Sequence, residues 1–349
     1  MPFSALPLIS RVASRVTRRR LLQRPERTEV ICAAERRISP SSLCLPDDMD
    51  RVIACTAESG FDLERERLAG GMKEHGATLL RTFRDVTILD GSLYGAGTYH
   101  AVRPTRRRII KVKDFARLES GLLCSNYVID RYFGHWLTDG LPLEALARER
   151  GLPGITLEKA RWSHEQGYRT LVGLSDAPVF AAKLSRLSIA DDRGLNSNWR
   201  ARIHKLKEAV RGSDPTGQAS SRVFLLRGNA ANKRSLINEE EVSNALQAQG
   251  FIVLSPERED ASHIAGILRN ASLVVSVEGS TQAHMVMAAA PGSTLLTIMP
   301  PRNFNSVFKP ICDALGIAWA FTVADDRGTE QFFQPVDRLL RLIDAIDRK

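Results

Sequence analysis

The chain has 349 residues, a length typical of two domains of ordinary size. Hydrophobic residues make up 43% of it, which supplies enough apolar side chains for buried cores and excludes a disordered chain. Lys and Arg number 49 against 40 Asp and Glu, so the net charge of +9 favours anionic partners. No apolar run is long enough to cross a bilayer. The five cysteines show no C-x-x-C spacing, and reduced thiols in a cytosol are their simplest interpretation.

Residues 1–28 are predicted to form a basic N-terminal segment. A short apolar stretch comes first there and arginines follow it, which is the reverse of the order in a secretory signal. An amphipathic segment lying on anionic lipid and a disordered tail both fit this pattern. We therefore expect a cytoplasmic protein, with peripheral attachment at the inner membrane face as an open alternative. The arginines are Arg11, Arg15, Arg18, Arg19, Arg20 and Arg24.

Residues 29–211 are predicted to form a mixed α/β domain. Strands dominate its first part and helices follow from about Gly134, but the pattern does not indicate a topology. The predicted strands are Val30–Ala34, Val52–Cys55, Thr78–Phe83, Val86–Leu89 and Arg108–Val112.

A motif from Asn126 to Pro142 contains two candidate catalytic residues, His135 and Asp139. They are four residues apart and therefore share one face of a helix. A His beside a carboxylate can act as a general base, whereas an isolated Asp, with a pKa of roughly 4, needs burial to do so at neutral pH. A polar pair that only stabilises the helix is the alternative. A metal site is not predicted, because an evident third ligand is missing.

The best domain boundary is the polar, turn-rich stretch 212–218. Residues 218–349 then alternate regularly between strands and helices, which predicts a Rossmann-like domain with a doubly wound parallel sheet. The predicted strands are Arg222–Arg227, Phe251–Leu254, the two apolar strands within 273–298, and Ile317–Phe321. The predicted helices begin at Asn238, Ala261, Ser280 or Thr281, Asn305 and Pro335.

The segment from Leu273 to Ile298 is the strongest local signal in this domain. The turn Glu278-Gly279-Ser280-Thr281 ends a buried strand, and Ser280 or Thr281 caps the next helix. Ligands of open α/β sheets bind beyond the carboxyl ends of strands, and free N–H groups at a helix start favour an anion. The turn therefore predicts a cradle for a phosphate-bearing ligand. His284, within the following helix, faces either that ligand or the core.

A second basic segment, residues 227–235, follows the first predicted strand of the same domain and lies at the same sheet edge. Its cations Arg227, Lys233 and Arg234 suit a diphosphate, because guanidinium groups bind phosphate oxygens bidentately. An exposed basic loop is the alternative. The glycine pattern of dinucleotide-binding enzymes is missing, which disfavours an NAD enzyme.

These motifs, in their order and spacing from about Val86 to Phe321, resemble glycosyltransferase family 61. The family's N-Y-x-H-W-x-x-D-x-L-P-x-L segment has its counterpart at 126–143, with additional residues before Gly134. The later motifs of the family are matched by Leu225-Leu226-Arg227, Asn232-Lys233-Arg234, Asn238-Glu239-Glu240, Gly250-Phe251-Ile252-Val253, Pro256-Glu257, Glu278-Gly279-Ser280 and Pro291-Gly292-Ser293.

The resemblance implies a two-domain GT-B-like architecture and a nucleotide-sugar donor, usually UDP-linked. It also implies a saccharide or glycolipid acceptor and inversion at the anomeric carbon without a metal or cofactor, with polysaccharide or capsule biosynthesis as the expected setting. Residues 29–211 would then form the acceptor side, and His135 or Asp139 the base. Glu278 stands where the family usually has His, and it would repel a diphosphate unless it contacts ribose or sugar hydroxyls. The expected donor-binding residues are Arg227, Asn232, Lys233, Arg234, Glu278, Gly279, Ser280, Thr281 and His284.

Two other functions use the same features. A protein that binds nucleic acid or another anionic polymer would use the arginine runs, but aromatic residues make up only 6% of the chain and do not interleave with them. Nucleic acid is therefore a disfavoured partner. A sugar-nucleotide epimerase of similar design would convert the donor without an acceptor.

Overall fold

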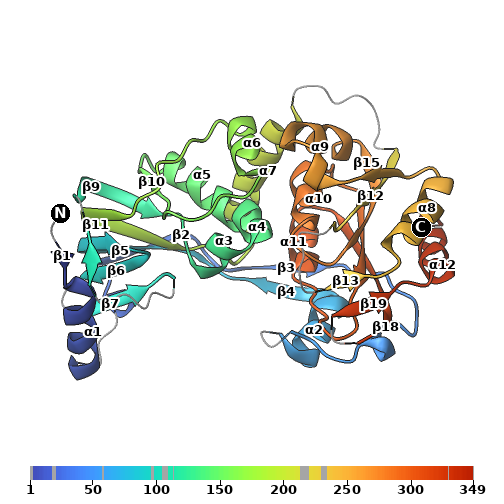
Figure 1. Ribbon diagram of the computed structural model, residues 1–349, viewed down its shortest axis with the longest axis horizontal. Helices are drawn as coiled ribbons and strands as arrows, with labels where there is room; N and C mark the ends of the chain where they lie inside the picture. Colours follow the sequence, from blue (N-terminus) through green and yellow to red (C-terminus); the bar gives the residue numbers. More distant parts are fainter. Residues whose placement is uncertain are drawn as a thin grey trace. The chain divides into compact units, whose positions relative to one another are not determined.

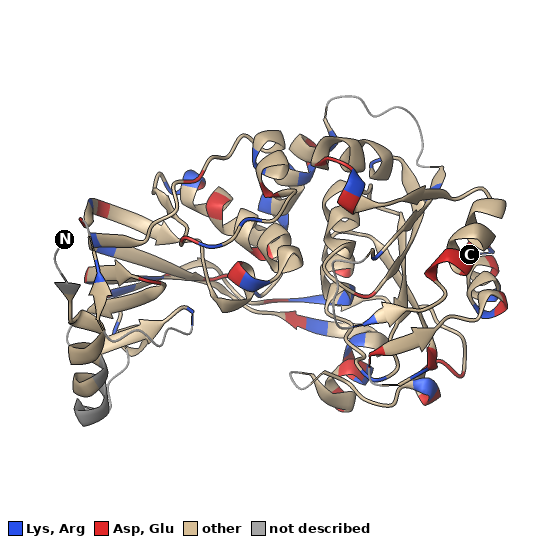
Figure 2. Ribbon diagram, in the orientation of Figure 1, with Lys and Arg blue, Asp and Glu red and all other residues tan. Residues whose placement is uncertain are grey.

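The computed structural model describes residues 3–17, 21–56, 59–95, 98–103, 109–112, 114–212, 220–228, 234–328 and 330–348. The chain divides into two compact units, and neither is contiguous in sequence. Unit 1 comprises residues 1–35, 76–165 and 173–202, and unit 2 comprises residues 36–75, 166–172 and 203–349. Both units are of the α/β class, with basic and acidic residues interspersed in each (Figure 2).

This division differs from the contiguous ranges expected from the sequence. Residues 1–28 belong to unit 1, whereas residues 36–75 belong to unit 2. The second assignment follows from long-range pairing: Leu43 lies in a parallel bridge with Ala320 in strand β17 (Ala318–Val323). Composition marks turn-rich stretches but does not reveal such pairings, and most of the expected boundary at 212–218 lies outside the described residues.

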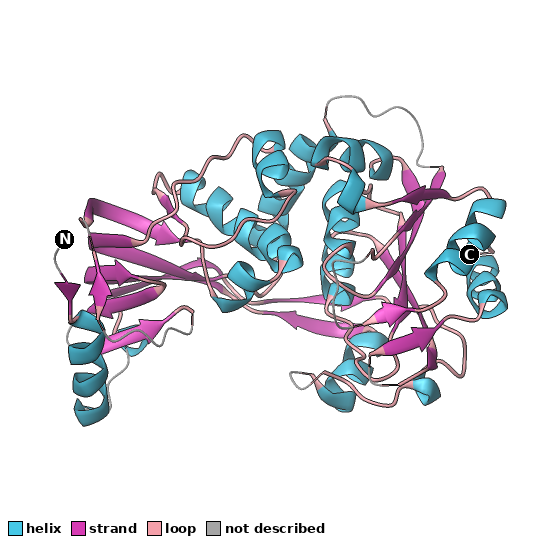
Figure 3. Ribbon diagram, viewed as in Figure 1, coloured by secondary structure: helices cyan, strands magenta, loops and turns pink. Residues whose placement is uncertain are grey.

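Unit 1 is built on a mixed seven-stranded sheet, which Figure 3 shows beside its helices. The order is β10-β9-β11-β5-β6-β7, and β2 also pairs with β5. The pairs β10–β9 and β9–β11 are parallel, and the others are antiparallel. The strands are β2 Arg27–Cys32, β5 Thr78–Leu89, β6 Ser92–Gly95, β7 Thr98–Ala101, β9 Ala116–Leu123, β10 Gly154–Ile155 and β11 Ala181–Asp191. Outside this sheet, β1 Phe3–Ser4 pairs with β8 Ile110–Lys111.

The helical elements assigned at least in part to unit 1 are α1 Leu6–Thr17, η1 Leu21–Gln23, α3 Tyr127–Arg131, α4 Phe133–His135, η3 Trp136–Gly140, α5 Leu141–Glu149, α6 Glu165–Leu171 and α7 Ser197–Arg211. The last two continue into residues assigned to unit 2.

Several strand predictions for this half of the chain are wrong. The two strands expected at 78–83 and 86–89 are one strand, β5, which passes through Asp85 at a positive φ of 50°. Residues 52–55 form no strand; within them only Cys55 makes an isolated bridge, to Phe304. The expected strand at 108–112 is reduced to β8 within the described residues. Strands β9 and β11 were not predicted, because polar residues interrupt their apolar pattern and their place depends on pairing with each other and with β5.

Unit 2 contains a five-stranded sheet in which every pairing is parallel, in the order β14-β12-β15-β16-β17. Numbered along the chain this order is 2-1-3-4-5, the flavodoxin-like arrangement of a doubly wound sheet. Helices α8 and α12 cover one face, and α9, α10 and α11 cover the other (Figure 1). The predicted fold class is thus confirmed: α/β, with two units and a doubly wound parallel sheet in the second.

The remaining elements of unit 2 agree with the predicted alternation. The sheet strands besides β17 are β12 Ser221–Leu225, β14 Ile252–Leu254, β15 Ala271–Val277 and β16 Thr294–Met299, and the helices are α8 Glu239–Ala248, α9 Ala261–Leu268, α10 Gln282–Ala288, α11 Phe308–Ala314 and α12 Val336–Asp347. Smaller elements are β3 Glu35–Ser39, η2 Met49–Arg51, α2 Gly60–Ala69, β4 Gly71–His75, β13 Ser235–Leu236, η4 Pro256–Arg258, β18 Asp325–Asp326 and β19 Gln331–Phe333.

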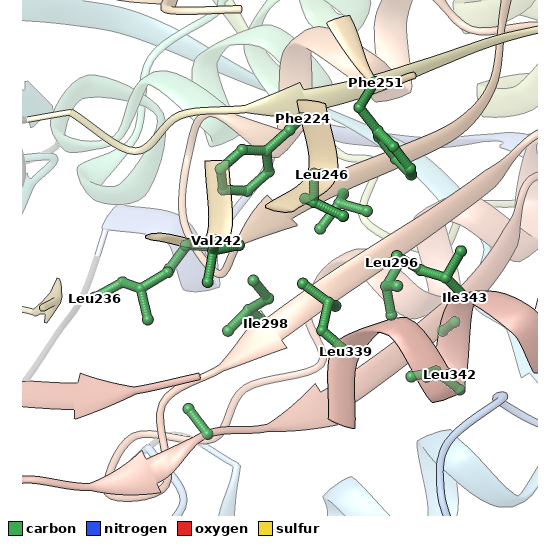
Figure 4. Close-up of a cluster of buried hydrophobic side chains, with 14 of the residues drawn as sticks. Phe224, Leu236, Val242, Leu246, Phe251, Leu296, Ile298, Leu339, Leu342 and Ile343 are labelled. Carbon is green, nitrogen blue, oxygen red and sulfur yellow. The ribbon is translucent and has the colours of Figure 1, made fainter. Parts of the chain in front are cut away.

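A buried apolar cluster holds α8 and α12 on the sheet, as Figure 4 shows. Phe224 and Leu296 come from the sheet, and Leu246 and Leu342 from the two helices; each is at most 1% exposed. Burying one such side chain stabilises a fold by about 1.5–3 kcal/mol. The cluster therefore keeps the sheet rigid beneath the loops at its carboxyl edge.

Lys207 of α7 makes the stability of the protein depend on pH. Its side chain is buried, its ammonium group donates a hydrogen bond to the Val286 carbonyl, and burial lowers its pKa to about 7. The unfolded chain, with an ordinary Lys pKa of about 10.4, holds more protons above pH 7, so stability rises with pH in that range. We expect the free energy of unfolding to rise by about 1 kcal/mol more between pH 7 and 8 in the wild type than in Lys207→Met.

Urea unfolding at pH 7.0, 7.5 and 8.0 measures this difference in slope. Lys205→Met, on the same helix, is the matched control and should keep the wild-type slope. Equal slopes for Lys207→Met and the wild type would contradict the prediction.

Candidate functional site

The strand order of the parallel sheet reverses between β12 and β15. At such a switch point the connections leave toward opposite faces and open a crevice at the carboxyl ends of the two strands. Arg227 lies two residues beyond β12, and Glu278 directly follows β15. The Arg227 guanidinium donates a hydrogen bond to the Glu278 carbonyl, so the structure brings the two predicted donor-binding segments together.

Gly279 permits this close approach. A Cβ at that position would lie 3.0 Å from a terminal nitrogen of Arg227, and its φ of +149° is one that other residues rarely adopt. Within the described residues, the backbone N–H groups of Gly279, Ser280 and Thr281 have no hydrogen-bond acceptor, and neither does the buried Nε of Arg227. The turn and the guanidinium thus present unused donors at one place.

Glu278 does not leave an uncompensated negative charge at this turn. Its carboxylate accepts a 2.5 Å hydrogen bond from Arg234, and its side chain is only 8% exposed. The Glu278 carboxylate therefore positions Arg234. Sequence reasoning anticipated both residues but not their ion pair, which joins positions 44 residues apart.

Two further acids near Arg227 were missed by the sequence analysis. Glu239 accepts a 2.7 Å hydrogen bond from the Arg227 backbone N–H, and burial raises the pKa of its carboxyl group. The Glu257 carboxylate lies beside Gly228, at whose position a Cβ would be 2.6 Å from the carboxyl carbon. Glu239 and Glu257 lie in two motifs that resemble those of the family, Asn-Glu-Glu and Pro-Glu. These motifs were the sequence signal that could have identified them as site residues. Carboxylates thus lie beside both described ends of the basic segment.

The other predicted donor-binding residues have different surroundings. Asn232 and Lys233 lie outside the described residues. Thr281 is the N-cap of α10, as predicted, but its side chain makes no capping hydrogen bond. His284 is buried, and its Nδ1 lies 2.7 Å from the Tyr168 hydroxyl. This contact accounts for His284 as a core residue of unit 2, the second of the two environments considered for it.

The second candidate site is the His135–Asp139 pair in unit 1. His135 Nδ1 lies 2.8 Å from Asp139 Oδ2, and the two side chains are 33% and 26% exposed. The intervening Trp136 and Leu137 are buried. Residues 136–140 form a π-helical turn, in which the Leu141 N–H donates to the Trp136 carbonyl. Such wide turns are frequent at functional sites, and the sequence did not indicate this one.

The hydrogen bond to Asp139 raises the pKa of His135 above its ordinary value, and burial opposes this effect only in part. The Thr138 hydroxyl lies 3.2 Å from the other Asp139 oxygen and 3.0 Å from the Gly134 carbonyl, and its single proton can be donated to either oxygen. Asp139 engages Nδ1, and no hydrogen bond to the second ring nitrogen, Nε2, is made by the described residues, so Nε2 can meet a substrate. An oriented imidazole of this kind can accept a proton from a substrate hydroxyl.

In the described part of the chain, no group of three or more His, Cys, Asp or Glu side chains is arranged to hold a metal ion. None of the described helices combines the length and apolar character that crossing a bilayer requires.

Parts of the chain are similar to known proteins. The model of a family described as Glycosyltransferase 61 matches residues 133–296. Among solved structures, the dodecameric iron-containing heptosyltransferase TibC, in complex with ADP-D-beta-D-heptose, is 11% identical with a TM-score of 0.34, over 78% of this chain and 94% of that one. The flavodiiron protein from Giardia intestinalis is 12% identical with a TM-score of 0.25, over 60% of this chain and 50% of that one. No curated protein sequence matches the chain.

The matched range includes the His135–Asp139 pair, Arg227, Arg234 and the turn after β15. Over this range the chain matches glycosyltransferase family 61, as the sequence motifs predict, and the match indicates glycosyl transfer.

Proposed function

We propose that this glycosyltransferase moves a sugar from a nucleoside diphosphate sugar, UDP-linked as is usual for the family, to a saccharide or glycolipid acceptor with inversion. The observation that carries the proposal is the convergence of Arg227, Arg234 and three unbound N–H groups at the switch point of the parallel sheet. Cations and fixed amide dipoles at such an edge are what a departing diphosphate requires.

On the donor side, Arg227 and Arg234 would offset the charge that develops on the diphosphate as the glycosidic bond breaks. Because Glu278 is paired with Arg234, the remaining acceptor capacity of its carboxylate can serve a ribose or sugar hydroxyl. The proposed donor set, acting without a metal or cofactor, is Arg227, Asn232, Lys233, Arg234, Glu278, Gly279, Ser280 and Thr281.

On the acceptor side, we assign His135 Nε2 as the general base and Asp139 as the group that orients and stabilises its imidazole. The acceptor oxygen would attack the anomeric carbon on the face opposite the diphosphate. A new C–O bond forms, the C–O bond to the diphosphate breaks, and the hydroxyl proton passes to Nε2. Single displacement of this kind inverts the anomeric configuration.

We also propose that the protein is cytoplasmic and contacts the inner membrane face through helix α1. Leu8, Ile9 and Val12 of this helix are 40%, 62% and 55% exposed. Apolar side chains of an amphipathic helix insert into the lipid headgroup region, and neighbouring arginines attract anionic lipid. This location would bring the enzyme to lipid-linked or polysaccharide acceptors.

Nucleotide binding tests the donor half of the proposal. We expect a nucleoside diphosphate at 100 times its Kd to stabilise the protein by about 2.7 kcal/mol, which raises the Tm by several degrees. Thermal unfolding with UDP, GDP, ADP and their sugar derivatives measures this shift. Uridine, which lacks phosphate, is the control and should give a much smaller shift. If none of the diphosphates raises the Tm, the proposal fails.

A further inference from the structure

An exposed surface next to His135 consists of Tyr127, Arg131 and Tyr132, and we name it the Tyr–Arg shelf. The two tyrosines are each 43% exposed, and Arg131 is exposed as well. Two partly exposed rings and a cation thus lie beside the candidate base. The donor and base roles proposed above use none of these three residues.

Helix α3 and its end build the shelf. Tyr127 and Arg131 are four residues apart and share a face of α3, while Tyr132 ends the helix in an extended conformation. The Arg131 guanidinium carbon lies 5.4 Å from the Tyr127 ring centroid and 5.5 Å from the Tyr132 ring centroid. Arg131 also donates a hydrogen bond to the Tyr127 hydroxyl. Two rings and one hydroxyl thus restrict a side chain that would otherwise be mobile.

Arg131 gives the shelf a positive charge. Within the described residues, no carboxylate lies within ion-pair distance of Arg131. The adjacent acid, Asp130, is buried and lies 3.5 Å from Arg103 instead. A cation held on two aromatic rings without an anionic partner is suited to bind a carboxylate from a ligand, because the planar guanidinium can donate two parallel hydrogen bonds.

The shelf also lies close to the proposed reaction centre. The Tyr132 ring centroid is 6.0 Å from that of His135. Exposed aromatic rings pack against the apolar C–H faces of sugar rings, while the hydroxyl groups around each sugar remain solvated. A sugar on Tyr132 would therefore lie near the imidazole that accepts the acceptor's proton.

We infer that the acceptor contains an acidic sugar, a uronate, whose ring packs on Tyr132 and whose carboxylate binds Arg131. This inference rests on the proposed function, because it names the acceptor class of the same reaction. It makes Arg131 the residue that distinguishes acidic from neutral saccharides and Tyr132 the residue that binds the sugar face.

Calorimetric binding of uronate oligosaccharides to the full chain, without donor, tests the inference. The probes are oligogalacturonate, oligoguluronate and hyaluronan fragments, each with its methyl-esterified counterpart of equal length. We expect at least one acidic probe to bind the wild type ten or more times more tightly than its ester. Arg131→Gln should abolish this preference, and Tyr132→Leu should weaken both forms. Arg193→Gln, which alters an 83% exposed arginine of the same unit, should change neither.

Equal binding of acid and ester, an undiminished preference in Arg131→Gln, or no binding of any probe would overturn the inference. Its failure is distinguishable from failure of the proposed function, because nucleotide binding is measured separately. If diphosphates bind and uronates do not, the acceptor assignment is wrong and the transfer proposal stands. If uronates bind and diphosphates do not, the shelf is a saccharide site and the transfer proposal is wrong.

Discussion

Replacing His135 by Ala is expected to lower kcat for sugar transfer by about 10²–10⁴-fold, the usual contribution of a general base. The proposed role of His135 is to accept the proton of the acceptor hydroxyl, and alanine has no group that can accept it. Nucleotide affinity should stay unchanged, because the proposed donor set excludes His135. Transfer assays with saturating donor and acceptor measure kcat, and thermal shift with UDP measures the donor affinity. A variant that retains most of its kcat would remove His135 from the reaction.

The pH dependence of Asp139→Asn separates an orienting carboxylate from a merely structural one. The base must be neutral, so the wild-type rate rises with pH through the pKa of His135, which Asp139 raises above its usual value of about 6.5. Asn cannot stabilise the imidazolium in the same way, and the acidic limb of the profile should therefore move to lower pH. The kcat on the plateau should also fall, because the favoured tautomer is lost. If the acidic limb of the Asp139→Asn profile stays at the same pH as in the wild type, this role of Asp139 is contradicted.

Arg227→Ala is expected to weaken nucleotide binding by about 1.5–3 kcal/mol, the cost of losing a hydrogen bond to a charged group. This corresponds to roughly a 10- to 150-fold increase in Kd. The guanidinium presents a buried Nε without a partner in the described chain, and it also ties the strand-end loop to the Glu278 carbonyl. Titration calorimetry with UDP or the best nucleotide of the panel gives the Kd.

Arg222→Ala is the matched control for Arg227→Ala. Arg222 lies near the amino end of the same strand, β12, and pairs with Asp347, far along the strand from the switch point. Its loss should leave the nucleotide Kd within twofold of the wild type. Arg227→Lys keeps a charge but not the planar fork, and its Kd should lie between those of Arg227→Ala and the wild type. Equal Kd values for Arg227→Ala and Arg222→Ala would exclude Arg227 from the donor site.

The two halves of the chain differ in how far the sequence predicts their folds. In the parallel sheet of unit 2, strands such as β15 and β16 are covered on both faces and form uninterrupted apolar runs between turn signals. In unit 1, β11 alternates buried and exposed residues irregularly, and it pairs with β9 and β5, which lie about 65 and 100 residues away. Such a strand is defined by its partners, which local patterns do not contain.

In the candidate sites, too, the sequence predicts the local motifs, whereas the contacts between distant residues depend on the fold. The spacing of His135 and Asp139 predicts a shared helix face, but the π-helical turn between them appears only in the folded chain. The motifs at Arg227 and at Glu278 each predict an anion site, yet the ion pair of Glu278 with Arg234 depends on how two strand ends meet. Their separation along the chain makes the pairing invisible to any local pattern.

By itself, the sequence determined the α/β class, the parallel sheet of unit 2 and the residue types that gather at its carboxyl edge, because periodicity and turn chemistry are local properties. Only the tertiary structure decided which segments form each unit, that His284 packs in the core against Tyr168, and that Arg131 lies between two exposed rings beside His135. These features arise from contacts between residues that are close in space. Closeness in space cannot be read from the separation of two residues along the chain.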